Sequence, residues 1–229
     1  MAHSELVESL KGKLIVSVQA YPGEPMRHPE TMAQIARACE LGGAAAIRCQ
    51  GLSDISAIKG RVEIPVIGLW KEGHEGVYIT PTLRHARACI HAGADVVALD
   101  ATDRPRLDGR TFEETVAALR AESDVLIMAD CMTMDDIRRA VAAGCDLVST
   151  TLSHNKAAID TTLDDGPDIA LLKAATTEFP GIAIICEGHV HTPQDARDAL
   201  DAGAWAVVSG TAITHPTSIT SWFATALED

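Results

Sequence analysis

Eight short apolar segments in this chain each end on a polar or small residue. Such continuously apolar segments are typical of parallel strands that helices cover on both faces. In a barrel of eight parallel strands and eight helices, the active site is built at the carboxyl ends of the strands. The pattern therefore predicts a single-domain α/β protein, a (β/α)₈ TIM barrel over residues 1–229. The segment ends are Gln19, Arg48, Lys71, Asp100, Asp130, Thr150–Thr151, Glu187 and Ser209–Gly210.

A repeated glycine supports the barrel. Gly43, Gly93, Gly144 and Gly203 each follow a predicted helix and precede an apolar segment. Glycine readily takes the left-handed conformation that ends a helix. The glycines lie roughly 50 to 60 residues apart, which leaves room for two strand–helix units in each interval. The last interval is the longest and predicts a loop extension after the sixth strand, around 154–167, that covers the ligand.

Helices are expected between the strands, and three of them have a threonine at the N-cap. The caps are Thr111, Thr133 and Thr192, and Glu114 completes a capping box with Thr111. A short extra helix is expected over 211–214. An open doubly wound sheet is the alternative, but it needs a glycine-rich turn after the first strand, and the turn here reads QAYPGEP. The predicted helices cover 29–41, 53–62, 82–92, 111–122, 133–143, 168–178, 192–202 and 216–228.

The net charge and the cysteine content limit which partners and which cellular compartment we expect for this chain. The formal net charge is −13, from 32 acidic and 19 basic residues. An acidic chain is a poor partner for nucleic acid or for an anionic membrane. The six cysteines are scattered without a C-x-x-C pair, as in a reduced cytoplasmic protein. The first residues lack the basic start and apolar stretch of a signal peptide, and no segment is long enough to span a membrane.

Four charged strand-end residues should converge at one mouth of the barrel: Arg48, Lys71, Asp130 and Glu187. A charge that ends an apolar strand is costly to bury unless it is paired. A salt-bridge network that closes the barrel is therefore one interpretation of each residue. The set as a whole favours catalysis, because all four lie at the end where barrel enzymes work.

Lys71 and Glu187 are the candidate acid–base pair. Confinement near Arg48 should lower the pKa of the lysine, so that it can accept a proton near neutral pH. Two proton carriers that flank one carbon suit enolisation and epimerisation. Asp130 could position a substrate hydroxyl or hold Lys71, and Arg48 could polarise a carbonyl or bind an anion. A Schiff base on the lysine is the alternative chemistry.

Glycines after the seventh and eighth strands point to a phosphate site. Gly188 and Gly210 stand where many barrels hold a phosphate on backbone N–H groups, beside a short extra helix. Histidines at 154, 189, 191 and 215 lie in the same loops and could bind zinc. They lack a recognisable metal spacing, so no metal and no cofactor are expected.

These residues lie in motifs that closely resemble the N-acylglucosamine-6-phosphate 2-epimerases, also called N-acetylmannosamine-6-phosphate 2-epimerases. The resemblance implies a metal-independent barrel, usually a homodimer, that acts in the cytoplasm on a sugar phosphate in amino-sugar and sialic-acid catabolism. It leaves two proton routes open: Lys71 and Glu187 each serve one face of the C2 carbon, or Lys71 activates a sugar hydroxyl that relays the proton, with Glu187 in support. The motifs run nearly from end to end: LIVSVQAYPGEP, GGAAAIRCQG, IPVIGLWK, VYITPT, ALDATDRPRLDG, MADCMT, VSTTLS, GPDIALLK, CEGHVHTP and GTAITHP.

The resemblance assigns roles by position. Lys71 and Glu187 are the expected catalytic residues, with Asp130 and Arg48 in support. The expected substrate-binding residues are those at the strand ends and in the loops that follow them. They are Gln19, Asp100, Thr150, Gly188, His189, Gly210, Thr211 and His215.

Three positions depart from the family pattern. Glu72, His189 and His215 stand where the family commonly has arginine, whose bidentate grip on phosphate histidine cannot reproduce. Histidine still donates one hydrogen bond and carries one charge when protonated. The departures keep two alternatives open, an epimerase of an unphosphorylated or differently phosphorylated N-acyl sugar and a non-catalytic sugar-phosphate binder. The presence of Lys71 and Glu187 together argues against a mere binder.

Overall fold

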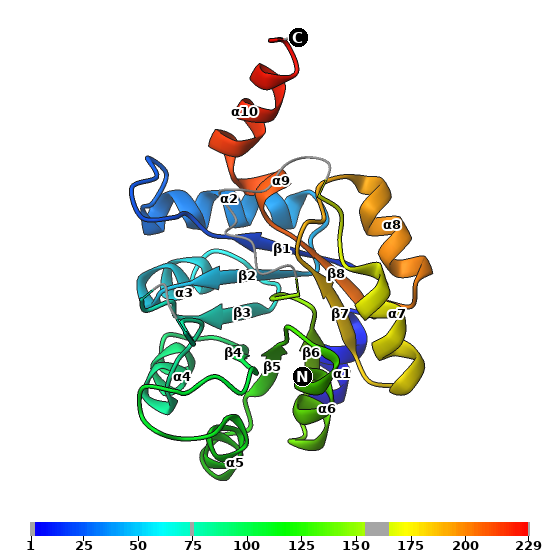
Figure 1. Ribbon diagram of the computed structural model, residues 1–229. Helices are drawn as coiled ribbons and strands as arrows, with labels where there is room; N and C mark the ends of the chain where they lie inside the picture. Colours follow the sequence, from blue (N-terminus) through cyan, green and yellow to red (C-terminus); the bar gives the residue numbers. More distant parts are fainter. Residues whose placement is uncertain (1–2, 74–75, 154–164, 229) are drawn as a thin grey trace.

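The computed structural model describes residues 3–73, 76–153 and 165–228. Within these ranges, parallel strands close into a barrel in the order β1 to β8, with each strand paired to its neighbour and β8 paired to β1. Figure 1 shows the strands surrounded by helices, as the sequence predicts. The (β/α)₈ barrel is confirmed.

The strands are short and begin and end close to the predicted positions. They are β1 (Leu14–Val18), β2 (Ala46–Gln50), β3 (Val66–Leu69), β4 (Val96–Asp100), β5 (Leu126–Asp130), β6 (Leu147–Ser149), β7 (Ile184–Glu187) and β8 (Ala206–Ser209).

The eight predicted helices between and after the strands are present, each within three residues of its predicted ends, and the short helix over 211–214 is confirmed. A further helix at the start of the chain was not predicted. The helices are α1 (His3–Ser9), α2 (Pro29–Leu41), α3 (Leu52–Lys59), α4 (Leu83–His91), α5 (Phe112–Glu122), α6 (Met134–Ala142), α7 (Ile169–Glu178), α8 (Pro193–Asp201), α9 (Thr211–Thr214) and α10 (Pro216–Thr225).

Local signals in the sequence explain where several helices begin and end. Thr111, Thr133 and Thr192 each form a complete capping box with an acidic residue three positions later. The four repeated glycines all have a positive φ, which at Gly43 is 100°. This conformation is strained for a residue with a Cβ atom, so the glycine repeat has a physical cause. The predicted loop extension around 154–167 lies largely outside the described residues.

The buried apolar side chains form two clusters, one inside the barrel and one between the strands and the surrounding helices. Strand residues that point inward, such as Ile15, Ile67 and Met128, form one cluster along the barrel axis. Residues that point outward, such as Val16 and Ile127, pack against the helices in the other. Adjacent residues of a strand therefore serve different clusters, which is the ordinary alternation of a buried strand. The inner cluster is a packed core and leaves the chemistry to the ends of the strands.

The unpredicted helix α1 packs against this inner cluster. Leu6 and Leu10 belong to it, and Leu10 is fully buried. The indole Nε1 of Trp205 donates to the carbonyl of Val7 over 2.9 Å, and Gly12 N donates to the carbonyl of Trp205 over 2.7 Å. A helix of this length is marginal in isolation, so its stability comes from these tertiary contacts. For that reason its sequence carries little helical signal.

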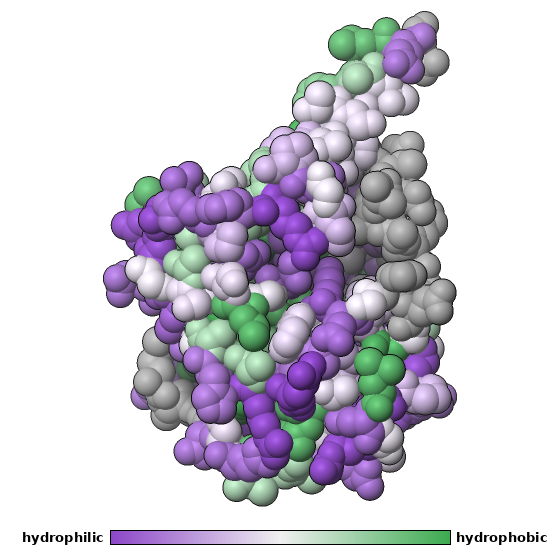
Figure 2. All heavy atoms as spheres, turned by 90° about the vertical axis from the view of Figure 1, so that its left-hand side faces the viewer, coloured by the Kyte–Doolittle hydropathy of each residue, from purple (hydrophilic) through white to green (hydrophobic). Residues whose placement is uncertain are grey.

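The last helix, α10, projects away from the barrel (Figure 1). None of its residues is buried, and the side chain of Phe223 is 72% exposed. Figure 2, which views the molecule from the side to which the arrowheads of β1 to β3 point in Figure 1, shows hydrophobic atoms near the free end of this helix. An amphipathic helix normally covers its apolar face, so the exposed side chains need a partner.

We expect Leu10→Ala to destabilise the protein by about 2–5 kcal/mol, because it leaves a cavity in the inner cluster. Urea unfolding followed by circular dichroism measures the change. Leu41→Ala is the matched control, because the Leu41 side chain is 73% exposed and such substitutions usually change stability by less than about 0.5 kcal/mol. Equal effects of the two substitutions would contradict the packing of α1 against the barrel interior.

Candidate active site

A buried arginine joins two carboxylates at the carboxyl end of the barrel. The Arg48 side chain, on β2, is 1% exposed. One of its NH₂ groups lies 2.7 Å from Asp130 Oδ2, and its Nε lies 3.0 Å from Glu187 Oε1. Since β2, β5 and β7 are not adjacent in the barrel, these contacts cross its interior. Burial acts to lower the pKa of Arg48, but the two carboxylates outweigh it and raise that pKa.

The surroundings of Glu187 disfavour the ionised form of its carboxyl group. Its pKa is raised to about 7, mainly by burial and also by the negative charge of Asp130, against the opposing effect of Arg48. Desolvation favours the neutral form of a carboxyl group, which here remains substantially protonated at neutral pH. Glu187 can therefore give or take a proton under ordinary conditions.

Lys71 lies just after β3 and is perturbed in the opposite direction. Its pKa is lowered to about 8, mainly by burial and also by the charge of Arg48, although Glu187 and Asp130 act against this. Among the described residues, no carboxylate lies within ion-pair distance of its ammonium group. Its Nζ lies 5.7 Å from the ring centroid of Tyr21. Lys71 can therefore gain or lose a proton near neutral pH, and no ion pair with a described residue fixes its side chain.

A short antiparallel ladder holds the backbone around Lys71. Lys71 pairs with Ile79, and Thr80 N donates to the carbonyl of Trp70 over 2.8 Å. Thr80 has a φ of 47°, an uncommon value for a β-branched residue. A strained residue persists only where its surroundings fix it, so the segment around Thr80 has a defined shape beside the lysine.

The two proton carriers can exchange roles. Lys71 and Glu187 have pKa values of about 8 and about 7. The two states in which the pair holds a single proton therefore differ by about one pKa unit, or ~1.4 kcal/mol. Either group can act as the base while the other acts as the acid. This property suits a reaction that must run in both directions at one carbon.

Of the remaining predicted residues, Gln19 presents a free acceptor. Its Nε2 donates to Ser17 Oγ over 2.8 Å. Its Oε1 is buried and has no hydrogen-bond partner within the described part of the chain. A buried acceptor without a partner is costly, so this oxygen is suited to receive a donor from a ligand.

Asp100 and Thr150 are engaged inside the protein instead. Both are fully buried. Asp100 accepts hydrogen bonds from Thr102 and pairs with Arg104 over 2.6 Å, which ties down the loop that follows β4. The hydroxyl of Thr150 donates to the main-chain carbonyl of Glu187 over 2.9 Å. The structure thus gives both polar groups partners within the protein.

Thr151 lies where the sequence places Thr150. Its hydroxyl is 2.7 Å from Asp130 Oδ1 and 3.1 Å from Glu187 Oε2. Alternation along the chain explains the difference, because residues 149 and 151 point to one side and residue 150 to the other. The parity of the neighbouring strand residues was the signal that could have identified Thr151.

The loops after β7 and β8 provide the predicted glycines. Gly188 has a φ of 105°, which disfavours any other residue at this turn. His189 follows with a φ of 56°, and its ring centroid lies 5.8 Å from that of His191. Gly210 and Thr211 mark the start of α9, as predicted. These groups lie on the two strands where barrels commonly bind phosphate.

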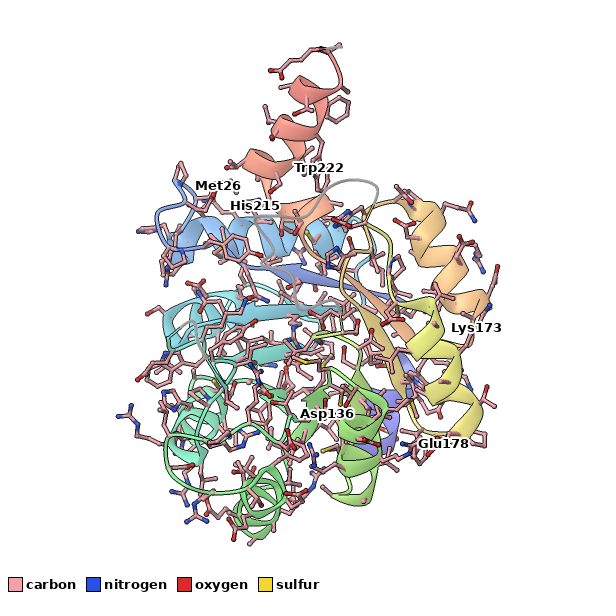
Figure 3. The ribbon with its side chains drawn as sticks, viewed as in Figure 1. Met26, Asp136, Lys173, Glu178, His215 and Trp222 are labelled. Atoms are coloured by element: carbon pink, nitrogen blue, oxygen red, sulfur yellow. The ribbon has the colours of Figure 1, made fainter. Side chains whose placement is uncertain are left out.

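The side chain of His215 lies at the start of α10 and contacts residues there (Figure 3). Its ring Nδ1 lies 2.7 Å from Ser218 Oγ, and its Nε2 lies 3.4 Å from Glu24 Oε1. The ring meets that of Tyr21 edge-on at 5.2 Å, and the residue is 4% exposed. This histidine therefore anchors α10 and the loop after β1 in the structure. Its predicted contact with substrate would require these interactions to rearrange.

Glu72, which also departs from the family pattern, interacts with His85. Glu72 Oε2 lies 2.7 Å from Nε2 of His85, whose Nδ1 lies 2.6 Å from Thr82 Oγ1. His85 is buried on α4 beneath Trp70, with the ring centroids 4.4 Å apart. The pair therefore fixes the segment that carries Lys71, and sequence analysis assigned no role to His85.

No trio of His, Cys, Asp or Glu side chains among the described residues is arranged to hold a metal ion. His154, one of the histidines considered for zinc, lies outside those residues. All six cysteines are free thiols. A search of the described helices for one long and apolar enough to cross a membrane found none.

Comparison with known proteins places the chain in a family. Residues 32–229 match the family model described as "Putative N-acetylmannosamine-6-phosphate epimerase". The chain belongs to this family. A relative from Cutibacterium acnes, named "Putative N-acetylmannosamine-6-phosphate 2-epimerase", is 58% identical over 97% of this chain and 96% of its own length. A relative of the same name from Corynebacterium glutamicum is 48% identical over 98% of this chain and 97% of its own.

Solved structures agree with this assignment. The N-acetylmannosamine-6-phosphate 2-epimerase from Clostridium perfringens superposes with a TM-score of 0.88 at 37% identity, covering 96% of each chain. A thiamine phosphate pyrophosphorylase from Pyrococcus furiosus superposes with a TM-score of 0.61 at 15% identity, over 97% of this chain and 98% of its own. The second likeness shows the barrel fold alone. The predicted family membership is confirmed.

The raised pKa of Glu187 predicts a pH-dependent stability. Its folded-state value of about 7 exceeds the ordinary 4.5, so protonation stabilises the folded state. This stability is fully present below pH 4.5 and is lost as pH rises through 7, a loss of roughly 3 kcal/mol. We expect Glu187→Gln to lose correspondingly less free energy of unfolding than wild type between pH 4.5 and pH 8.

Urea unfolding at a series of pH values measures this difference. Glu63→Gln is the control, because it removes an exposed carboxyl group at a distance from the site and should retain the wild-type pH dependence. If Glu187→Gln and wild type lose stability in parallel over this range, Glu187 does not have the raised pKa described above.

Proposed function

We propose that this chain interconverts N-acetylmannosamine 6-phosphate and N-acetylglucosamine 6-phosphate by removing and returning the proton at C2. The observation that carries the proposal is the presence of Lys71 and Glu187 at one barrel mouth, with pKa values of about 8 and about 7 that both lie close to neutrality. Family membership and the names of the similar proteins support the choice of substrate. They also favour it over the unphosphorylated sugar and over a non-catalytic binder.

The chemistry follows from the substrate and the pair. In the open-chain sugar, the C1 carbonyl acidifies the proton at C2, because the resulting carbanion is delocalised as an enolate. One of the two groups removes this proton from one face of C2. The other returns a proton to the opposite face, which inverts the centre. The small free-energy difference between the two protonation states of the pair lets the enzyme reset for either direction.

Arg48 acts on this chemistry through its charge. It lies 3.0 Å from Glu187 and holds the carboxylate in place without neutralising it fully. Its positive charge also contributes to the lowered pKa of Lys71. Negative charge that develops on the sugar oxygen during enolisation would be stabilised by such a fixed cation in a water-poor site.

We place the substrate phosphate at the ends of β7 and β8. Gly188, His189, Gly210 and Thr211 lie there, and the glycines allow close approach of backbone N–H groups. Gln19 Oε1, a buried acceptor that has no hydrogen-bond partner among the described residues, is available to a sugar hydroxyl. Asp100, Thr150 and His215 enter this proposal only as supports of the surrounding loops.

We also propose that the enzyme is a cytoplasmic homodimer that needs no metal. Six free thiols suit a reducing compartment. The exposed apolar side chains of α10 and of the residues just after it suit an interface with a second copy, because Phe223 is 72% and Leu227 is 86% exposed. Lys71 and Glu187 can supply acid–base catalysis near neutral pH without a metal ion.

Proton NMR in D₂O tests the activity. We expect loss of the C2 proton signal of N-acetylmannosamine 6-phosphate and appearance of the gluco epimer, with no reaction of free N-acetylmannosamine. A chelator should leave the rate unchanged. Lys71→Ala should reduce the rate by about 100-fold or more, the scale of general acid–base catalysis. Exchange on the free sugar alone would move the function to an unphosphorylated substrate, and no exchange on either would overturn the proposal.

The pH–rate profile provides a second test. Only the enzyme that holds one proton on the Lys71–Glu187 pair is active in either direction. We therefore expect a bell-shaped kcat/KM profile whose limbs report pKa values of about 7 and 8. The forward and reverse reactions should share the same bell. A profile that stays flat from pH 6 to pH 9 would contradict the pair's role.

Sedimentation of wild type and Phe223→Asp tests the homodimer. A charge on the exposed face of α10 should shift the protein toward the monomer without unfolding the barrel, because no residue of α10 is buried. Glu228→Gln, which changes charge beyond the helix, is the control. A wild-type monomer at micromolar concentration would contradict the dimer.

A further inference from the structure

Three oxygen atoms lie close to the hydroxyl of Thr151. Its Oγ1 lies 2.7 Å from Asp130 Oδ1, 2.8 Å from Ser149 Oγ and 3.1 Å from Glu187 Oε2. Ser149 and Asp130 are fully buried, and Glu187 is 9% exposed. Three short oxygen–oxygen contacts therefore meet at one atom in a site with little access to water.

Each of these contacts needs a proton between the oxygens, or it is repulsive. The hydroxyls of Thr151 and Ser149 supply one proton each. The three contacts need three, so the third must belong to a carboxyl group. The cluster is satisfied only if Asp130 and Glu187 together carry one proton.

The surroundings decide which carboxyl group carries it. Asp130 Oδ2 accepts a charge-assisted hydrogen bond from Arg48 over 2.7 Å. Glu187 Oε1 lies 3.0 Å from Arg48 Nε, but that Nε–H forms no hydrogen bond within the described residues. The more strongly bonded carboxylate is that of Asp130, so the proton lies on Glu187.

We propose that Thr151 is a positioning residue that keeps the catalytic proton on Oε2 of Glu187. In this arrangement Thr151 donates to Asp130 and accepts from both Ser149 and Glu187. One donated and two accepted bonds use the full capacity of a hydroxyl group. The protonated form of Glu187 is thereby held in one rotamer, with its proton on Oε2, before substrate binds.

This inference deepens the proposed epimerisation and rests on it for its catalytic meaning. An acid whose proton lies on Oε2 has a fixed direction for proton transfer, and Thr151 sets that direction. Loss of orientation of this kind can cost a reaction about 100-fold. The placement of the proton itself, however, is a property of the resting protein and does not depend on the substrate.

Infrared spectroscopy of the resting protein tests the placement without substrate. At pH 6 we expect a carbonyl band of a protonated carboxyl group that Glu187→Gln removes and Asp130→Asn does not. Thr151→Val should shift this band to higher frequency, because the acid loses its acceptor. Thr151→Ser should leave it in place. Absence of the band, its removal by Asp130→Asn alone, or a band unchanged in Thr151→Val would overturn the proposal.

Kinetics test the consequence for catalysis. Thr151→Val should lower kcat by about 100-fold with a smaller change in KM, and Thr151→Ser should restore most of the rate. In Thr151→Val the acid limb of the pH profile should move to lower pH, because the protonated form loses its acceptor. A limb that moves to higher pH would show that Thr151 donates to the carboxylate instead. Unchanged kcat would equally overturn the role.

Thr115→Val is the matched control. Thr115 is a buried threonine of α5 whose hydroxyl donates to the carbonyl of Thr111 over 2.9 Å, at a distance from the strand ends. It should keep the wild-type profile and band. If wild type turns over none of the sugars, the proposed function fails while the infrared result still decides the position of the proton.

Discussion

The active site depends on one buried positive charge. The guanidinium of Arg48 lies between Asp130 and Glu187 in an interior where charges are expensive. Removing one partner of such a buried arrangement typically costs about 3–5 kcal/mol, because the remaining charges stay uncompensated. The same guanidinium lowers the pKa of Lys71 and limits how far the pKa of Glu187 rises. Structure and reactivity therefore have a common electrostatic cause.

The barrel supplies the conditions for this arrangement. Its inner apolar cluster excludes water beneath the site, and its parallel strands bring residues far apart in the chain to one end. Burial then perturbs the two proton carriers in opposite directions, the acid upward and the base downward. Their pKa values meet near neutrality, which neither group reaches in water. The largely hydrophilic face in Figure 2 lies at this end of the barrel.

The sequence predicts the fold and the ionic residues well because both follow from local pattern. Apolar segments end on or next to Arg48, Lys71, Asp130 and Glu187. Residues at the carboxyl ends of the strands of a parallel barrel lie at the same mouth. The glycine repeat and the capping threonines likewise act over a few residues. These signals are independent of the rest of the chain, so they can be recognised in one sequence.

The features that were not predicted depend on tertiary contacts. Helix α1 is stabilised by the barrel interior, and His215 by Glu24 and Tyr21, which lie far away in the sequence. The choice between Thr150 and its neighbour turns on a single residue of register, which flips a side chain to the other side of the strand. The polar segment from Ser149 to Thr151, at and just after the end of β6, gives no apolar pattern to fix that register.

Site-specific NMR titration of Glu187 and Lys71 tests the central electrostatic claim most directly. With carbon-labelled glutamate and nitrogen-labelled lysine, the two resonances are assigned by their absence from Glu187→Gln and Lys71→Ala. We expect the Glu187 carboxyl to titrate near pH 7 and the Lys71 ammonium near pH 8 in the ligand-free protein. Titration of the glutamate near 4.5 and of the lysine near 10.5 would contradict the claim that Arg48 and burial tune this pair.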